Sequence, residues 1–447
     1  MKKILFLIVP LTLGSAFAAP DFNAVLEAHH QANPYMGTVV VMKDGQRVFE
    51  KAIGKANLEF DVPASMQTVY EIGSITKSFT AAAILKLQEQ GKLKVSDPVS
   101  TFLPGFPNGD RITLHHLLTH TSGLPSFTGF PDFLETQKLQ KTQDQLIDSF
   151  KNLPLEFEPG DRFQYSNSGF TLLGKIIEVA SGQPYQDYIT ENILNPLGFK
   201  QVQFHSRLDL VPNRATGYVP EGTSYRLPES HNVEIAGPAG GLFATADELA
   251  LWLPSLSEGK VLGPDSVKAF TTAQVYIGNE PGFQNYGYGV GVGSFAGKKV
   301  LAHGGSINGF NAMMLYFPEE KLSIVALSNL DGNSSSLVAS DLAKVALGAE
   351  VTLPEPRVAV EVPVSVLETY AGLYEVPDLQ TTLRIFVKKG QLMVEVPGAG
   401  EFALVPESSQ KFYLSIARNH LTFSQGPEGM VLEISAGENR AVGKKVQ

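Results

Sequence analysis

The 447-residue chain has no cysteine, which excludes disulfide bonds, thiol catalysis and a lipid anchor attached to cysteine. It has no long basic run either, and because its formal net charge is -10, we expect no nucleic-acid partner. No apolar run approaches the roughly 20 residues that a membrane-spanning helix needs. What remains is an ordinary composition with 43% hydrophobic and 18% charged residues. We therefore expect a globular protein without a membrane span in its mature form.

The first residues carry a targeting pattern. Lys2 and Lys3 precede an apolar run over residues 4–13, and the sequence Ala-Phe-Ala follows at residues 16–18. A basic start, a short apolar run and small residues at the cleavage point are typical of a signal peptide. The alternative, an uncleaved membrane anchor, needs a longer apolar run. We expect cleavage after Ala18 and an exported protein, either periplasmic or secreted.

The chain is too long for one hydrophobic core, because single cores stop growing at about 250 to 300 residues. Residues 352–363 contain three prolines and no helical or hairpin pattern, which indicates a stiff linker. Short alternating segments fill the rest of the chain and predict a small antiparallel β-barrel. The expected organisation is a signal peptide over 1–18, a main domain over 19–351, a linker over 352–363 and a barrel domain over 364–447.

The main domain has strand patterns near both of its ends and helical patterns between them. Two alternating runs, residues 37–42 and 47–52, flank Asp44-Gly45, a strong hairpin signal. Strand patterns return over residues 300–302, 312–317 and 322–327. These patterns predict an α+β fold in which one antiparallel sheet, flanked by the terminal helices, carries a large helical insertion.

A Ser-x-x-Lys pattern occurs three times, at Ser74, Ser257 and Ser408. Only Ser74 begins a long apolar helical pattern, which runs to about residue 90 and is followed by Gly91, a typical residue after a helix end. Lys77 lies one helical turn from Ser74, so the two side chains can touch. A serine needs such a neighbouring base to act as a nucleophile. The plainer alternative is that Ser74 caps the helix and Lys77 is solvated.

Two further pairs can carry chemistry. Tyr165 and Asn167 form a Tyr-x-Asn pair in a turn-rich stretch, where a phenol can transfer protons and an amide can orient a carbonyl. His303 and Gly305 follow a strand pattern, and glycines there allow close approach of a ligand or another backbone. The next residue, Ser306, can then offer its N–H to a developing oxyanion. The alternatives are a surface tyrosine and a plain strand end.

Together the three elements resemble the active-site motifs of the serine β-lactamase-like and penicillin-binding-protein-like hydrolases, which include class C β-lactamases, D-amino-acid-specific peptidases and esterases. Two other stretches match the wording of that family, HLLTHTSGL at residues 116–124 and PAGGLFAT at residues 238–245. The resemblance covers about residues 25–345. The final segment, which begins near YAGLY at residues 370–374, resembles a lipocalin-like barrel attached to some members.

This resemblance implies that Ser74 is acylated while Lys77 and Tyr165 share the proton transfers. Asn167 would orient the substrate amide, and the N–H groups of Ser74 and Ser306 would form the oxyanion hole. Water then releases the acyl group. No cofactor or metal is implied, and the nine histidines show no H-E-x-x-H or comparable spacing.

One position departs from the β-lactamases of this group, which usually have Lys-Thr-Gly where this chain has His303-x-Gly305. A lysine recognises a substrate carboxylate by charge, whereas a histidine carries at most a partial charge near neutral pH. With His303 and Gly305 as substrate-binding residues, the favoured function is an acyl hydrolase acting on D-amino-acid peptides, amides or small esters.

Other functions stay open. A β-lactamase or D-Ala-D-Ala carboxypeptidase shares the motifs, and a catalytically inactive penicillin- or peptide-binding protein can keep them as well. An α/β-hydrolase would need a G-x-S-x-G elbow, which the chain lacks. His115, His116 and His120 are interpreted as structural residues of a leucine-rich helical run. The oligomeric state and the role of the barrel are left open by the sequence.

Overall fold

The computed structural model describes residues 21–446 apart from residues 33–34, 207, 222–223, 279–282, 357, 380, 398–399, 415–418, 428 and 437–438. The expected signal peptide and its cleavage point lie outside the described residues. Within the described part of the chain, every helix is too short or too polar to cross a bilayer.

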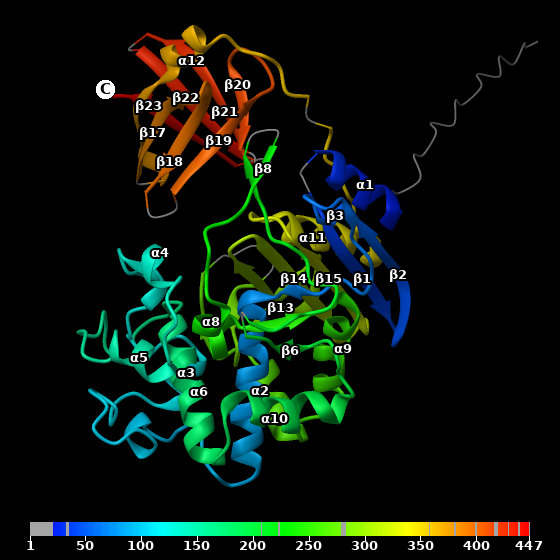
Figure 1. Cartoon of the computed structure of the whole chain (residues 1–447), viewed down its shortest axis with the longest axis vertical. Helices are drawn as coiled ribbons and strands as arrows, with labels where there is room; N and C mark the ends of the chain where they lie inside the picture. The colour runs from blue at the N-terminus through cyan, green and yellow to red at the C-terminus, as the bar shows by residue number, and fades with distance from the viewer. Residues whose placement is uncertain are drawn as a thin grey trace, which may run out of the picture.

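One antiparallel sheet organises the main part of the chain (Figure 1), with strands in the order β10-β11-β12-β13-β14-β15-β1-β2. The N-terminal strand β1 pairs with β15, and Val40 lies opposite Val325. The sheet therefore joins the two ends of this region, as the strand patterns predicted. Its strands are β1 (Gly37–Lys43), β2 (Gln46–Ile53), β10 (Val275–Tyr276), β11 (Asn285–Tyr286), β12 (Gly291–Phe295), β13 (Lys298–Ile307), β14 (Phe310–Phe317) and β15 (Leu322–Ser328).

The turn between β1 and β2 has the predicted chemistry. Asp44 and Gly45 both have positive φ, 52° and 75°, as a tight two-residue hairpin turn requires. In β1, successive side chains point to opposite faces of the sheet. Val39 and Val41 belong to one hydrophobic cluster, and Val40 belongs to the other.

Helices cover both faces of the sheet. The terminal helices α1 (Phe22–Ala32) and α11 (Ser334–Leu347) pack on one face and are joined by a buried contact of 2.9 Å between His29 and Asp341. On the other face lie α2 (Thr76–Glu89) and α9 (Ala246–Ser257). The Phe79 ring stacks on Trp252 at 4.0 Å. The central helix α2 is thus buried, as its apolar pattern predicted.

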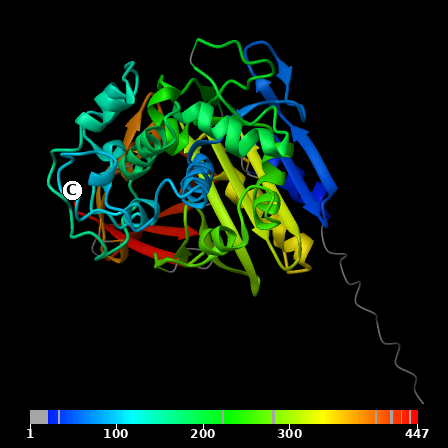
Figure 2. The same cartoon turned by 90° about the horizontal axis from the view of Figure 1, so that it is seen from below.

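The middle of the chain forms a helical region beside α2 (Figure 2). Its longest helix, α6 (Asn167–Ser181), begins at the Tyr-x-Asn pair. The other helices here and near the sheet are α3 (Leu114–Leu118), α4 (Phe133–Thr136), α5 (Gln143–Asp148), α7 (Tyr185–Ile189), α8 (Val233–Gly240) and α10 (Pro264–Thr271). The short strands are β3 (Lys55–Asn57), β4 (Val62–Pro63), β5 (Tyr70–Glu71), β6 (Gln203–Phe204), β7 (Val219–Glu221), β8 (Ser224–Arg226) and β9 (Leu242–Ala244).

The C-terminal segment closes into an eight-stranded antiparallel barrel at one end of the molecule (Figure 1). The last strand returns to the first, so that Tyr374 lies opposite Lys445. Aromatic rings fill the interior, and Tyr370 at the end of α12 (Val364–Tyr370) stacks on Phe423 at 4.4 Å. The strands are β16 (Gly372–Val376), β17 (Thr381–Lys388), β18 (Gln391–Val396), β19 (Gly400–Pro406), β20 (Lys411–Leu414), β21 (His420–Gly426), β22 (Gly429–Ala436) and β23 (Asn439–Lys445).

Candidate active site

Ser74 lies in a single 3-10 turn, Gly73–Ile75, directly before α2. This turn meets strand β13 through two glycines. A Cβ added to Gly305 would lie 1.9 Å from the Ile72 carbonyl oxygen, and one added to Gly73 would lie 2.9 Å from the Ser306 nitrogen. Since real Cβ contacts are longer, only glycine allows this approach. It brings the backbone nitrogens of Ser74 and Ser306 to the same part of the molecule.

Lys77 is fully buried below the serine. Its Nζ lies 3.0 Å from the Ser74 Oγ and 2.7 Å from the carbonyl oxygen of Ala239. Burial lowers the pKa of Lys77 well below its usual value, because an apolar environment disfavours the charged amine. The structure thus excludes the solvated Lys77 of the plainer alternative and gives Ser74 a basic neighbour.

Tyr165 covers Lys77, whose Nζ lies 4.8 Å from the centre of the phenol ring. The residue is 36% exposed, so it borders the opening of the site. Desolvation raises the pKa of Tyr165, and a hydrogen bond with the Ser74 side chain lowers it by less. The phenol therefore keeps its proton at neutral pH and is available as a donor.

Asn167 begins α6 and lines the same pocket as Ser74. Its Nδ2 donates to the Thr128 Oγ1 at 3.0 Å, and its backbone N–H donates to the Ser126 Oγ at 3.1 Å. These contacts hold the amide in one orientation, because one of its two N–H groups is engaged with Thr128. The Asn167 oxygen then remains to accept an N–H from a ligand.

His303 uses both ring nitrogens within the protein. Its Nδ1 lies 2.6 Å from the Gly304 carbonyl oxygen, and its Nε2 lies 2.8 Å from the Tyr286 hydroxyl. A carbonyl only accepts, so Nδ1 carries the proton and Nε2 accepts from the phenol. Burial, and secondly the charge of Lys77, lower the pKa of His303 to about 4. The ring is neutral at neutral pH and cannot attract a carboxylate by charge.

His120 is a site neighbour that the sequence did not reveal. It was placed in a helical run, but α3 ends at Leu118 and His120 adopts a positive φ of 56° outside it. The buried ring stacks on Tyr165 at 4.1 Å, and its Nδ1 accepts the Ser166 N–H at 3.1 Å. Burial lowers the pKa of His120 well below its usual value, and interactions with Lys77 and His303 lower it further. His120 therefore holds the Tyr-x-Asn turn as a neutral ring.

A pocket of about 250 Å³ opens beside Ser74 and Asn167. Its walls are largely apolar and include Phe127, Phe133 and Ile235. The polar lining comes mostly from amides and one histidine, namely Gln137, Asn167, Asn232, Asn308 and His231. Lys77, Tyr165 and His303 are absent from this lining, so the pocket extends away from the proton-transfer groups.

One side of the pocket is closed by a side-chain bridge. Asn308 donates to the Gln137 Oε1 at 3.2 Å and to the Glu229 carbonyl oxygen at 2.9 Å. The bridge ties the turn between β13 and β14 to the helical region. Both Asn308 and Gln137 line the pocket.

A wider cleft of about 920 Å³ lies between this region and the barrel. Ser306, Asn308 and Glu229 line one side, and Lys388 and Glu401 of the barrel line the other. The barrel therefore borders the approach to the oxyanion-hole candidate Ser306. Within the described part of the chain, no three histidine or acidic side chains are grouped to hold a metal ion.

Comparison with known proteins finds one matching family model and several similar proteins. Residues 26–348 match the family model described as Beta-lactamase. "Penicillin-binding protein 4*" of Bacillus subtilis (strain 168) is 28% identical over 449 residues, which cover 95% of this chain and 98% of that protein. "Putative penicillin-binding protein PbpX" of the same organism is 31% identical over 317 residues, 70% of this chain and 75% of that protein.

Two solved structures are similar as well. The octameric penicillin-binding protein homologue from Pyrococcus abyssi is 28% identical with a TM-score of 0.66, and the match covers 94% of this chain and 98% of that chain. A D-stereospecific amidohydrolase from Streptomyces sp. is 27% identical with a TM-score of 0.61, over 70% of this chain and 95% of that chain. The first match includes the barrel segment, and the second covers a shorter part of the chain.

Proposed function

Because the chain belongs to the β-lactamase family of serine hydrolases, we propose that it hydrolyses aminoacyl amides, peptides or esters through an acyl-Ser74 intermediate. The observation that carries the proposal is the buried Lys77, whose Nζ lies 3.0 Å from the Ser74 Oγ. Its lowered pKa makes the neutral amine accessible near neutral pH, and a neutral amine can accept a proton.

Acylation assigns a role to each neighbour. Lys77 takes the hydroxyl proton as the Ser74 Oγ bonds to the substrate carbonyl carbon, and the N–H groups of Ser74 and Ser306 stabilise the oxyanion. As the tetrahedral intermediate collapses, the bond to the leaving amine or alcohol breaks. Tyr165 donates its proton to that group and regains one from the Lys77 ammonium. Water then attacks the ester carbonyl, Lys77 accepts its proton, and Ser74 is released with its proton restored.

The two sides of the site suggest where the substrate lies. The leaving group needs a proton donor, so it lies beside Tyr165, and the acyl group occupies the pocket that contains Asn167. We place His303, which is absent from the lining of the acyl pocket, on the leaving-group side, and its ring is neutral. An uncharged leaving group is therefore favoured over one that bears a carboxylate, as in β-lactams and carboxypeptidase substrates. The similar D-stereospecific amidohydrolase supports D-aminoacyl amides as the first substrates to test.

Mass spectrometry of the purified protein tests this function. The protein is exposed to a fluorescent penicillin, p-nitrophenyl esters, and D- and L-aminoacyl p-nitroanilides, with Ser74→Ala as the control. Turnover, or an adduct of acyl mass, that is lost in Ser74→Ala supports the acyl-serine mechanism, and the reactive compounds identify the subclass. Stable labelling by penicillin without turnover of any probe would instead favour a penicillin-binding protein. Equal behaviour of wild type and Ser74→Ala contradicts the nucleophile assignment.

We also propose export, with cleavage after Ala18, a hydrolase domain over residues 19–351, a linker over 352–363 and a barrel domain over 364–447. The basic and apolar start of the sequence supports export. The three prolines over residues 352–363 support the linker. N-terminal sequencing of the protein from its native source should begin at Ala19. Limited proteolysis should cut within residues 352–363.

A further inference from the structure

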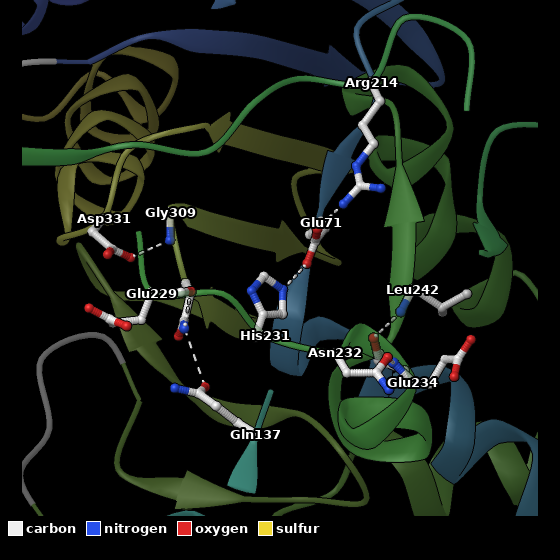
Figure 3. Close-up of polar contacts among 12 residues, drawn as sticks. Glu71, Gln137, Arg214, Glu229, His231, Asn232, Glu234, Leu242, Gly309 and Asp331 are labelled. Carbon is white, nitrogen blue, oxygen red and sulfur yellow. Dashed lines mark hydrogen bonds and ion pairs between the residues drawn. The ribbon is translucent and has the colours of Figure 1, made fainter. Parts of the chain in front are cut away.

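A buried carboxylate lies behind the candidate acyl pocket. Glu71 ends strand β5, three residues before Ser74, and its side chain is 1% exposed. One carboxylate oxygen accepts from the Arg214 Nη2 at 2.9 Å, and the other lies 2.7 Å from the His231 Nε2 (Figure 3). The three residues come from distant parts of the sequence. We call them the Glu71 cluster.

The Glu71 cluster decides which nitrogen of His231 carries the proton. An ionised carboxylate only accepts hydrogen bonds, so the His231 Nε2 donates to Glu71. Arg214 gives this carboxylate a positively charged partner. In a neutral ring with its proton on Nε2, the other nitrogen is an acceptor.

The second ring nitrogen of His231, Nδ1, points away from Glu71 (Figure 3). Among the residues that the structure describes, none makes a hydrogen bond to this nitrogen, and His231 lines the pocket that contains Ser74. Figure 3 shows one ring nitrogen directed at Glu71 and the other turned away from it, toward the side where Gly309 lies. Because His231 lines the pocket, Nδ1 is the ring nitrogen that remains for a ligand group there.

The surrounding charges favour a donor at this point. Asp331 lies close enough to interact electrostatically with His231, and its Oδ1 accepts the Gly309 N–H. Glu229 is balanced by Lys138 at 3.4 Å. Arg214 is paired with Glu71, and neither it nor any other described lysine or arginine lines the pocket. An anionic group would gain little here, whereas an amine or amide N–H would meet an acceptor.

We propose that the His231 Nδ1 accepts the amino or amide N–H of an aminoacyl substrate, and that Glu71 and Arg214 act as positioning residues that fix this tautomer. The phenyl rings of Phe127 and Phe133 then select an apolar side chain on the same acyl group. This inference rests on the proposed acyl-Ser74 function. It names the acyl specificity that the function leaves open.

A pair of substrates that differ only in the N–H tests the inference. Phenylalanine p-nitroanilide, as D and L forms, is compared with 3-phenylpropionyl p-nitroanilide, which lacks the amine. His231→Phe keeps an aromatic ring but removes the acceptor. We expect kcat/KM to fall about tenfold or more for the amino substrate, mainly through KM, because a buried hydrogen bond is lost. The desamino substrate should change less than about twofold, and His30→Ala on the distant α1 should change neither.

Glu71→Gln provides a variant of equal size. Its carbonyl oxygen can keep Arg214, and its NH2 group then faces the His231 Nε2, which must accept. The ring proton moves to Nδ1, so the pocket-facing nitrogen becomes a donor. The amino substrate should lose as much as in His231→Phe. Nitrogen-15 NMR of histidine-labelled protein should show His231 protonated on Nε2 in the wild type and on Nδ1 in Glu71→Gln.

The outcomes of these measurements test the role of His231 separately from the acyl-serine function. Equal losses on both substrates, no loss on either, or a wild-type His231 protonated on Nδ1 overturns the role of His231 while leaving the acyl-serine function in place. If the wild type hydrolyses neither substrate, the proposed function fails. In that case titration with D- and L-phenylalaninamide decides, and binding that persists in His231→Phe overturns the inference.

Discussion

The contact between Gly305 and the nucleophile turn makes a sharp prediction. In Gly305→Ala, the new Cβ would lie 1.9 Å from the Ile72 carbonyl oxygen and 3.3 Å from the Ser74 nitrogen. Its neighbour provides a matched control, because a Cβ on Gly304 would meet nothing closer than the Met313 sulfur at 3.7 Å. The two substitutions add the same methyl group to adjacent residues of one strand. Only the first forces the backbone to move.

The expected fall in kcat follows from how far the added Cβ of Gly305→Ala must move from the Ile72 carbonyl oxygen. Real Cβ contacts below 3.0 Å are essentially absent, so β13 and the Ser74 turn must separate by about 1 Å in Gly305→Ala. That displacement moves the Ser306 N–H away from the oxyanion position. Loss of one such donor costs about 10²- to 10³-fold in kcat, and a misplacement of about 1 Å costs a similar factor. We expect a fall in kcat of about 100-fold or more for Gly305→Ala and of less than about threefold for Gly304→Ala.

The assay is steady-state hydrolysis of whichever p-nitrophenyl ester or aminoacyl p-nitroanilide the wild type turns over. Thermal unfolding of both variants checks that they fold. If Gly305→Ala keeps wild-type kcat, the close approach of β13 to Ser74 has no role in catalysis. An equal loss in Gly304→Ala would show that the effect is not the specific contact with Ile72.

Three further predictions concern buried groups. Lys77→Met should abolish turnover but raise the thermal unfolding temperature at pH 7. The folded-state pKa of Lys77 lies below its unfolded value of about 10.4. The unfolded wild type therefore binds more protons than the folded protein, and the stability of the wild type rises with pH. The gap in unfolding temperature should therefore narrow between pH 6 and 9.5, and a gap that widens would contradict a lowered pKa. His303→Lys should raise, by about tenfold, the ratio of kcat/KM for a D-aminoacyl dipeptide with a free carboxylate to kcat/KM for the same dipeptide as its amide, since a lysine adds the missing charge. An unchanged ratio would show that this position does not face the leaving group. His120→Phe keeps the ring stacked on Tyr165 but leaves the Ser166 N–H without its acceptor, so we expect a loss of about 1 to 3 kcal/mol in the free energy of unfolding and about tenfold in kcat, measured by denaturant unfolding and hydrolysis.

Much of the fold was readable from local patterns. Asp44-Gly45 predicted the hairpin of β1 and β2, because few residues adopt positive φ at both turn positions. Alternating segments predicted the antiparallel barrel, and the apolar circumference of residues 74–90 predicted a buried helix. The Ser74 and Lys77 contact was also predictable, since a helix places residues three apart side by side whatever surrounds them.

The residues that tune the site were not predictable in this way. His120 was assigned to a helix, yet it is the stacking partner of Tyr165. Glu71 and His231 lie 160 residues apart and carry no motif of their own. Nothing in a local pattern connects them. Their contact exists only because β5 and the segment before α8 meet beside the pocket.

The sequence by itself determined which chemical groups are present and which neighbours along the chain face one another. It specified a serine with a lysine one turn away, a tyrosine with a nearby amide, and a histidine with a glycine two residues later. The tertiary structure decided the state of two of these groups: the lowered pKa of Lys77 and the neutral ring of His303. The physical reason is that desolvation and hydrogen bonding add up over all neighbours in space, and most of those neighbours, such as Ala239 for Lys77 and Tyr286 for His303, come from segments that only folding brings together.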